Sequence, residues 1–207
     1  MAGPDRTAAL AQYRQRAGVY DLELMPFEPV RRLAVGLLDL RPGQVVLDIG
    51  CGTGLSLPLL VSAVGRSGRA LGIDQSPEMI ERALARVESA AWQNVTLIGA
   101  PVEVAEIPIA ADAALFHFTH DVLQQPQALA NVIGHLKPGA RVVATGLKWA
   151  PPWQAWANLF VLPAALRSVS SLAGLDSPWR GLSSRLRNLQ VQTLLAGSIY
   201  VARGEVV

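Results

Sequence analysis

The chain has 207 residues, a formal net charge of +2, and a composition of 51% hydrophobic and 16% charged residues. A chain of this length builds one α/β domain with a real core and leaves no room for a second sizeable domain. So apolar a composition excludes a disordered chain, and it permits a surface that meets lipid or an apolar substrate. We therefore expect one domain over residues 1–207.

Charge is unevenly distributed along the chain. Residues 1–136 carry 10 Lys and Arg against 14 Asp and Glu, whereas residues 137–207 carry 8 against 2. A solvated basic surface is the simplest explanation for the cationic C-terminal third. Contact with nucleic acid, with anionic lipid or with an acidic substrate are the alternatives.

Cysteine content and apolar runs bear on the compartment. Cys51 is the only cysteine, so the chain forms no intrachain disulfide and fits a reducing compartment. We recognise no secretory leader at the N-terminus. The longest apolar run, residues 155–166, is interrupted by Asn158 and Pro163 and falls short of the roughly 20 residues that span a bilayer. These features predict a cytoplasmic protein, with peripheral contact to the inner face of a membrane as an alternative.

The central motif of the sequence is a short apolar segment followed by alternating glycines. Residues 45–49 predict a buried parallel strand, and residues 55–60 predict a helix packed on the sheet. Between them, Gly50 and Gly52 allow a sharp turn at which a ligand touches bare backbone, and Gly54 allows the helix to pack close to the strand. A purely structural turn is the alternative.

Asp48, two residues before the first glycine, sharpens this interpretation. A carboxylate at this place repels the pyrophosphate of a dinucleotide but attracts a ligand that carries an ammonium group. The G-x-G-x-G spacing of the glycines also departs from the G-x-G-x-x-G fingerprint of dinucleotide-binding loops. Charge and spacing therefore both argue against NAD.

Residues 46–54, Val-Leu-Asp-Ile-Gly-Cys-Gly-Thr-Gly, resemble the first motif of class I S-adenosylmethionine-dependent methyltransferases. This resemblance implies an α/β fold with a doubly wound, seven-stranded, mostly parallel sheet (a Rossmann-like methyltransferase fold) that ends in an antiparallel hairpin. It also implies S-adenosylmethionine as the cofactor, with the loop backbone around its methionine part and the acid near its amino group. The loop residues then expected to bind the cofactor are Asp48, Gly50, Cys51, Gly52, Thr53 and Gly54.

A second acid ends the next predicted strand, residues 69–74. Asp74 lies about 20 residues beyond the glycines, where one carboxylate can bind both hydroxyls of a ribose, and the resemblance implies that role. The segment that follows supplies a helix cap at Ser76 and a proline in the first turn. Gln75 and Met79 are expected beside the cofactor, with Met79 against the adenine.

Adenine recognition departs from the family pattern. Many relatives have an Asp after the third predicted strand, residues 94–99, whereas this chain has Ala100 and Pro101 there. We expect Pro101 and Val102 to border the cofactor, with backbone groups or Glu103 contacting the adenine.

A titratable cluster follows the fourth predicted strand, residues 112–118. Open α/β sheets bind ligands at the carboxyl ends of their strands, where His117, His120 and Asp121 are expected. His120 and Asp121 are the candidate catalytic residues and His117 is a candidate cofactor contact, although adjacency in sequence does not by itself make a dyad. With His135 as the one further histidine and no cysteine cluster, we expect no metal site.

Two helices are predicted before the first strand, one at residues 5–17 and a second that opens at the prolines Pro26 and Pro29. In the family such a pair forms a lid over the cofactor. Residues 1–43 are therefore expected as an N-terminal helical lid and residues 44–147 as the cofactor-binding core.

Aromatic residues are the candidates for contacts around the acceptor. Tyr13 is a candidate substrate contact and Tyr20 a candidate cofactor contact, with packing against the sheet as the alternative. The Trp-rich stretch at residues 148–188 corresponds to a variable insert that caps the acceptor pocket in the family, and Trp149 and Trp153 are its candidate substrate contacts. Core packing or a lipid interface are the alternatives for these tryptophans.

The end of the chain predicts one more parallel strand and a hairpin. Residues 136–143 contain a helix end, a Pro-Gly turn and a fifth strand. Residues 189–207 are expected as the terminal hairpin, with strands at 191–196 and 198–203 on either side of Gly197.

Together these features predict transfer of a methyl group from S-adenosylmethionine, by in-line displacement, to N, O or C of a small-molecule acceptor. Alignment and desolvation carry most of the rate in such a reaction because the sulfonium is already an activated leaving group. A lipid-headgroup N-methyltransferase at a membrane surface and a non-catalytic cofactor-binding subunit are the alternatives, and a homodimer is compatible with the sequence. Nucleic acid is disfavoured as a partner because the chain lacks the Asn/Asp-Pro-Pro-Tyr/Phe motif of base-amino methyltransferases.

Overall fold

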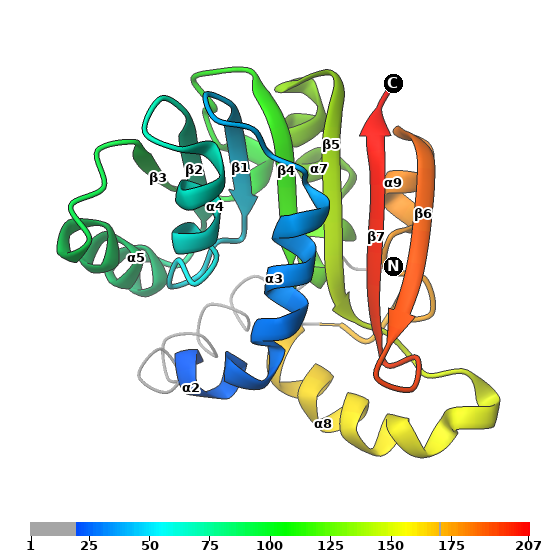
Figure 1. Cartoon of the computed structure of the whole chain (residues 1–207). Helices are drawn as coiled ribbons and strands as arrows, with labels where there is room; N and C mark the ends of the chain where they lie inside the picture. Colours follow the sequence, from blue (N-terminus) through cyan, green and yellow to red (C-terminus); the bar gives the residue numbers. More distant parts are fainter. Residues whose placement is uncertain (1–19, 170) are drawn as a thin grey trace.

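The computed structural model describes residues 20–169 and 171–207. Its centre is a seven-stranded sheet with the strand order β3-β2-β1-β4-β5-β7-β6 (Figure 1). The strands are β1 (Val45–Ile49), β2 (Arg69–Asp74), β3 (Val95–Gly99), β4 (Ala111–His117), β5 (Leu136–Leu147), β6 (Leu186–Leu194) and β7 (Ile199–Val206).

The pairing of the strands confirms the predicted fold class. β3, β2, β1, β4 and β5 are parallel to one another, whereas β7 is antiparallel to both β5 and β6. The chain therefore winds outward from β1 in two directions and closes with an antiparallel hairpin. The direction in which successive strands are added to the sheet reverses between β1 and β4. Ligands of open α/β sheets bind outside the carboxyl ends of the strands at such a reversal.

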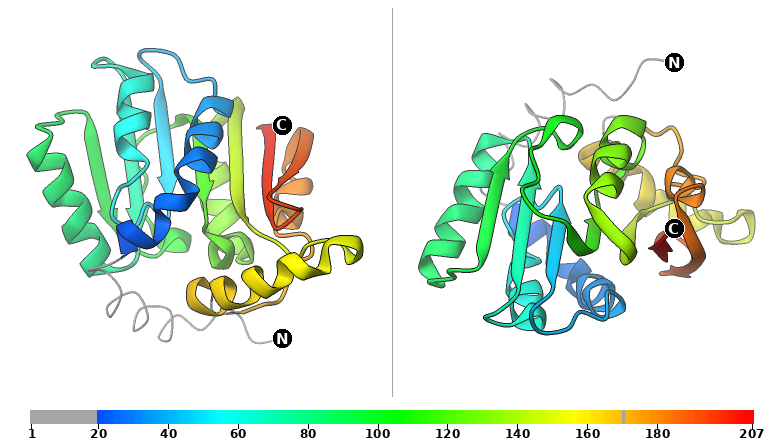
Figure 2. Two further views of the ribbon diagram at one scale, coloured as in Figure 1. Left: turned by 60° about the horizontal axis from the view of Figure 1, so that its bottom comes forward. Right: turned by 90° about the horizontal axis from the view of Figure 1, so that it is seen from above.

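Helices cover both faces of the sheet (Figure 2). One face carries α3 (Glu28–Leu37), α4 (Leu57–Val64) and α5 (Pro77–Ser89), and the other carries the 3-10 helix η2 (Val102–Val104), α7 (Pro126–Gly134) and α9 (Arg180–Ser183). Successive side chains of a strand point to opposite faces. Val46 and Leu47 of β1 accordingly belong to two different hydrophobic cores, which explains why all of β1 is buried.

Several short elements lie near the carboxyl ends of the parallel strands, among them α2 and α8 (Figure 1). They are α2 (Tyr20–Leu24), the 3-10 helix η1 (Met25–Phe27), α6 (His120–Leu123), the 3-10 helix η3 (Pro152–Ala157) and α8 (Asn158–Ser168). In the part of the chain that the structure describes, no helix has the length and apolar character that crossing a bilayer requires.

The element boundaries depart from the sequence predictions in two places. The expected turn at Pro138 and Gly139 is a bulge inside β5, because Leu136 pairs with Ala111 before the register shifts. β6 begins at Leu186, within the stretch expected as the insert, because this leucine pairs with β7 and is buried in the core. The helix predicted at residues 5–17 lies outside the described residues.

Candidate active site

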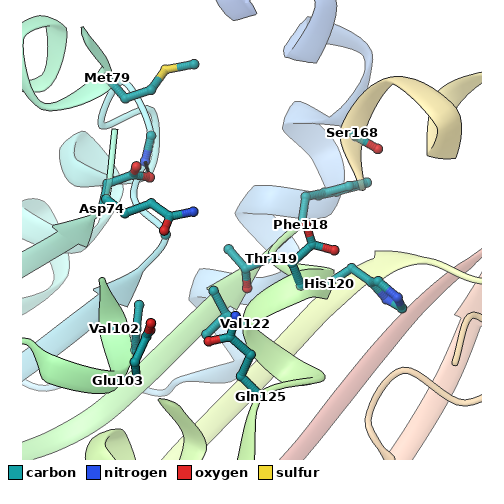
Figure 3. A pocket seen from close by; sticks show the side chains of 14 residues that line it. Asp74, Met79, Val102, Glu103, Phe118, Thr119, His120, Val122, Gln125 and Ser168 are labelled. Carbon is teal, nitrogen blue, oxygen red and sulfur yellow. Dashed lines mark hydrogen bonds between the residues drawn. The ribbon is translucent and has the colours of Figure 1, made fainter. Parts of the chain in front are cut away.

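A pocket lies at the carboxyl ends of β1, β2 and β4, where the winding direction reverses (Figure 3). It contains about 750 Å³ of empty volume, open solvent included. The sequence-predicted residues that line it are Gly50, Gly52, Asp74, Gln75, Met79, Val102, His120 and Asp121.

The glycine turn gives the pocket its backbone wall. Gly50, Gly52 and Gly54 have φ values of +65°, +54° and +77°, a region that residues with a side chain rarely adopt. A Cβ on Gly50 would also lie 2.4 Å from the Thr119 methyl carbon. A Cβ on Gly54 would lie 2.7 Å from Leu57 in the first turn of α4. Gly54 thus leaves room for the first turn of α4 and for Ala83 of α5, which would lie 3.4 Å from that Cβ.

Asp74 fixes the turn from the end of β2. Its Oδ2 accepts a hydrogen bond of 2.9 Å from the Gly52 amide, and its Oδ1 accepts one of 2.9 Å from the Ser76 amide. Burial raises the pKa of this carboxyl, while the amide hydrogen bonds oppose that rise. Each carboxylate oxygen has two lone pairs, so the same side chain can still accept hydrogen bonds from a ligand in the pocket.

A second, smaller cavity lies behind the glycine turn and contains buried charges. Its lining includes Asp48, Arg31 from α3, and His117 at the end of β4. Arg31 is 2% exposed and Asp48 is 1% exposed. Within the described residues, the Asp48 Oδ2, the Arg31 Nε and the His117 Nε2 have no hydrogen-bond partner. A buried acceptor and a buried donor without partners are costly, and a polar ligand that pairs with both relieves that cost.

The electrostatics of this smaller cavity suit a zwitterion. Burial raises the pKa of the Asp48 carboxyl to about 7, although the nearby Arg31 charge lowers it. Burial, together with the Arg31 charge, lowers the pKa of His117 to about 3, so this imidazole is neutral. His117 Nδ1 lies 2.9 Å from the Thr145 hydroxyl. An amino acid group, with one ammonium and one carboxylate, matches Asp48 and Arg31 in sign, so these residues fit the methionine part of S-adenosylmethionine.

The other two loop residues are packed rather than open to the main pocket. Cys51 is buried, and a Cβ on Gly72 of β2 would lie 2.9 Å from its sulfur. Burial raises the pKa of the Cys51 thiol far above its ordinary value, which leaves it a poor nucleophile. Thr53 lines the smaller cavity, and its hydroxyl donates a hydrogen bond of 2.5 Å to Asp21 of α2.

Asp21 and Arg86 tie three elements together at the loop. The Arg86 Nη2 of α5 lies 2.7 Å from the Asp21 Oδ2, and the Arg86 Nε donates a hydrogen bond of 3.0 Å to the Thr53 carbonyl. The Arg86 guanidinium therefore connects α5 both to α2 and to the glycine loop. We call these contacts among Asp21, Thr53 and Arg86 the loop tether.

His120 has a defined tautomer on the acceptor side of the pocket. Its Nε2 lies 2.9 Å from the Ala173 carbonyl oxygen, which can only accept, so Nε2 carries the proton. Nδ1 then presents a lone pair, and this buried atom has no partner among residues 20–169 and 171–207. Burial lowers the pKa of His120, which the Ala173 hydrogen bond and the Asp121 charge partly offset. The imidazole is therefore neutral near pH 7 and able to accept a proton.

The remaining predicted residues lie elsewhere or outside the described chain. Pro101 is half-buried beside the pocket but does not line it, whereas its neighbours Val102 and Glu103 do. Trp149 is half-buried and Trp153 is 81% exposed, and neither lines the pocket. Tyr13 precedes the described residues. Tyr20 begins α2, but its side chain is not among those described.

Sequence reasoning missed Arg31 and Phe118. Arg31 lies at helical spacing with the buried Ala34, Val35 and Leu38, so an arginine on an apolar stripe was the available signal. Phe118, which lines the pocket after β4, has a φ of +58°. Such a strained backbone at a site cannot be read from an apolar segment of sequence.

The described residues contain no group of three His, Cys, Asp or Glu side chains arranged to hold a metal ion.

Comparison with known proteins places this geometry in a family. Residues 46–139 match the model of a methyltransferase domain. The aklanonic acid methyltransferase DauC of Streptomyces sp. (strain C5) is 30% identical over 174 residues, which are 81% of this chain and 77% of that protein. The nocamycin O-methyltransferase of Saccharothrix syringae is 30% identical over 150 residues, which are 68% of this chain and 51% of that protein. This chain belongs to the class I S-adenosylmethionine-dependent methyltransferases.

Solved structures agree on the fold. The N-methyltransferase NodS from Bradyrhizobium japonicum WM9 superposes with a TM-score of 0.64 at 19% identity, over 88% of this chain and 97% of that one. Several other curated relatives share only a fraction of their length with this chain, between 28% and 32%. The acceptor of this chain therefore has to be argued from the site.

Proposed function

We propose that this protein transfers the methyl group of S-adenosylmethionine to a hydroxyl oxygen of a small organic acceptor. The names of two relatives that match 68% and 81% of this chain, one of them an O-methyltransferase, support a small-molecule acceptor. The observation that carries the choice of oxygen is the buried, unpartnered Nδ1 of His120 in the pocket lining.

The cofactor is assigned to both cavities. Arg31 and Asp48 would hold the carboxylate and the ammonium of its methionine part, the Gly50–Gly54 backbone would border the same part, and Asp74 would bind the ribose. Met79, Val102 and Glu103 lie farther along the main pocket and would border the adenine. S-adenosylmethionine supplies an activated methyl group on a sulfonium.

His120 and its neighbours act on the acceptor. The Nδ1 lone pair accepts the proton of the acceptor hydroxyl, while the hydrogen bond from Nε2 to the Ala173 carbonyl holds the ring in place. Phe118 and Val122 give this side of the pocket apolar walls that exclude water. Asp121 also lines the pocket and its charge stabilises the imidazolium that forms.

His120→Gln and His120→Ala test the assignment. The probes are S-adenosylmethionine with an isotope-labelled methyl group and a panel of simple phenols and hydroxybenzoic acids, with methylated product detected by mass. Loss of a general base lowers turnover by about 100- to 10,000-fold, whereas the affinity for S-adenosylhomocysteine should stay within a few-fold of wild type.

The pH profile separates a base from a purely structural histidine. Because burial lowers the pKa of His120 below its ordinary value of 6.5, wild-type turnover should remain high down to and below that pH and fall only at lower pH. Both variants should lack this acid limb. Unchanged turnover in the variants contradicts the base assignment, and an inability of the wild type to bind S-adenosylhomocysteine contradicts the proposed function itself.

Methylated product from the wild type would exclude the non-catalytic cofactor-binding subunit. Methylated product from a panel of amines, but not from the hydroxyl panel, would show that the methyl-accepting atom is nitrogen. Such an acceptor would not need His120 as a base.

A further inference from the structure

An exposed apolar surface lies along η3 and α8, next to the proposed active site. We call it the α8 apolar face and define it by six side chains that are between 41% and 81% exposed: Trp153, Trp156, Leu159, Phe160, Leu162 and Leu166. The rings of Trp156 and Phe160 pack edge to face with centroids 6.5 Å apart. These two rings, one on η3 and one on α8, therefore form one apolar surface across the junction of the two helices.

The helix that carries this face is apolar on both sides. Val161 and Ala165 of α8 are buried against the protein, as is Ala157 at the end of η3. Leu159, Phe160 and Leu166 point to the opposite side. A helix that is apolar all round is expected to be covered on every side, either by a protein core or by lipid. α8 lies at the edge of the molecule in Figure 1 and in the left view of Figure 2.

Charge indicates which kind of surface covers this face. No Asp or Glu occurs between Lys148 and Leu175, and Arg167 lies in the last turn of α8. A second copy of the chain would bring this acid-free stretch and its Arg167 against themselves, because an isologous interface pairs a patch with itself. An anionic lipid surface instead complements the charge, and tryptophans favour the interfacial layer of a bilayer.

The end of the α8 apolar face meets the pocket. Ser168, the last residue of α8, lines the pocket beside Phe118, and the two lie on the same side of it (Figure 3). Because the helix ends at the site, a surface that covers α8 also lies next to the pocket mouth.

We propose that the α8 apolar face docks the protein onto an anionic lipid bilayer, so that the pocket takes an apolar acceptor that partitions into that bilayer. The part that concerns the acceptor rests on the proposed function, whereas the docking does not. α8 then lies in the plane of the interface, with its exposed apolar side in the headgroup and acyl boundary and its buried side on the protein.

Vesicle co-sedimentation of the full chain tests the docking. The probes are vesicles of phosphatidylcholine alone and of phosphatidylcholine with an equal amount of phosphatidylglycerol. The wild type should bind the anionic vesicles at least about tenfold more tightly than the neutral ones, and the emission of its tryptophans should shift to shorter wavelength on binding. Leu159→Ser/Phe160→Ser should lower the partition coefficient by about tenfold or more.

A matched double variant controls for loss of exposed apolar surface in general. Leu84 and Val104 are 47% and 66% exposed on α5 and η2, and Leu84→Ser/Val104→Ser should bind vesicles like wild type. Trp153→Ser, at the most exposed position of the face, is the second test variant if the first one folds poorly. Calorimetry with S-adenosylhomocysteine on each variant shows separately whether the cofactor site is intact.

Three outcomes would overturn the docking. The first is a wild type that binds neither kind of vesicle. The second is a wild type that binds, but no less tightly after Leu159→Ser/Phe160→Ser than after the control substitutions. The third is a wild-type dimer in solution that this variant converts to a monomer, which would show that a second copy covers the face. In each case wild-type binding of S-adenosylhomocysteine would leave the proposed function standing.

Discussion

Asp48 and Arg31 are both buried, and the Arg31 charge acts on the Asp48 carboxyl. Hydrogen bonds within the described residues do not fully satisfy either side chain. The Asp48 Oδ2 and the Arg31 Nε lack partners within the described part of the chain, and Arg31 pairs through its Nη1 with Glu28. The free protein thus bears the desolvation cost of two charged groups. Because ligand binding relieves that cost, substitution of either residue should change the affinity for the ligand measurably.

Asp48 should make cofactor affinity depend on pH. Its carboxyl must ionise to attract the ligand ammonium, and burial raises its pKa from 3.8 to about 7. Calorimetry with S-adenosylhomocysteine should therefore show affinity rising between about pH 6 and pH 7.5, and falling again only at alkaline pH, where the ligand amine loses its proton. Asp48→Asn should bind more weakly and lack the acid limb. An acid limb that survives in this variant would assign it to another group.

The same shift has a consequence for stability. Because the folded pKa of Asp48 lies above its unfolded value, the folded state binds the proton more tightly. The contribution of Asp48 to stability is therefore lost as the pH rises from about 4 to about 7. Asp48→Asn should melt at a higher temperature than wild type at pH 8, with a smaller difference at pH 5.

Arg31 should recognise only ligands that carry a carboxylate. Arg31→Met should weaken S-adenosylhomocysteine by roughly 10- to 100-fold, the loss expected for a buried hydrogen bond to a charged group. Binding of 5′-methylthioadenosine, which lacks the amino acid part, should change little. Arg32→Met is the control, since Arg32 is exposed and pairs with the same Glu28. Equal losses for both ligands would mean that Arg31 acts on the fold and not on the carboxylate.

At the scale of elements, the loop tether joins α2 to the glycine loop and α5 through Arg86. The pair that Arg86 forms with Asp21 is partly exposed, with side chains 31% and 46% accessible. Pairs of this kind contribute about 0–1 kcal/mol and are screened by salt. The loop tether is therefore expected to hold these three elements together only weakly.

Arg86→Met should weaken S-adenosylhomocysteine by only about two- to fivefold, in line with that energy. The loss should appear in a faster dissociation rate and should shrink at high salt, where the wild-type pair is already screened. Stopped-flow dissociation at low and high salt measures both effects. Arg82→Met, an exposed arginine of the same helix, should behave like wild type, and a similar acceleration there would remove the tether as the cause.

The elements that the sequence predicted well are those with local signals. The glycine turn, the strands around it and the cap at Ser76, whose hydroxyl accepts from the Met79 amide, follow from residues that are neighbours in the chain. The bulge in β5 and the start of β6 at Leu186 depend on pairing with distant strands. Arg31 and the Ala173 carbonyl reach the site from other segments, which no local pattern reveals.

At the scale of the whole molecule, ligand binding should stabilise the fold by mass action. S-adenosylhomocysteine at 100 times its dissociation constant adds about 2.7 kcal/mol. For a domain of about 200 residues this corresponds to a rise in melting temperature of about 5–11 °C. NAD at the same concentration should give no shift, because Asp48 and the G-x-G-x-G spacing do not suit a pyrophosphate. A comparable rise in melting temperature with NAD would contradict the assignment of S-adenosylmethionine as the cofactor of this chain.

The strand order of the sheet also was predictable only through the family resemblance. Periodicity indicates that strands exist, but β1 pairs with β2 and β4, whose partner residues are 24 and 67 positions away in the chain (Val45 with Arg69, Val46 with Ala113). The packing of α8 was not predicted, because its outer face is as apolar as its inner one and periodicity cannot tell them apart.

The winding reversal between β1 and β4 divides the pocket lining along the chain. The residues assigned to the cofactor, from Arg31 to Glu103, all precede β4, whereas the acceptor side, from Phe118 to Ser168, follows it. Under the proposed roles, one stretch of the chain determines the affinity for the methyl donor, and a later stretch determines which acceptor is methylated. Substitutions during evolution can then change the later stretch and leave the earlier one unchanged, so relatives with the same donor can diverge in what they methylate.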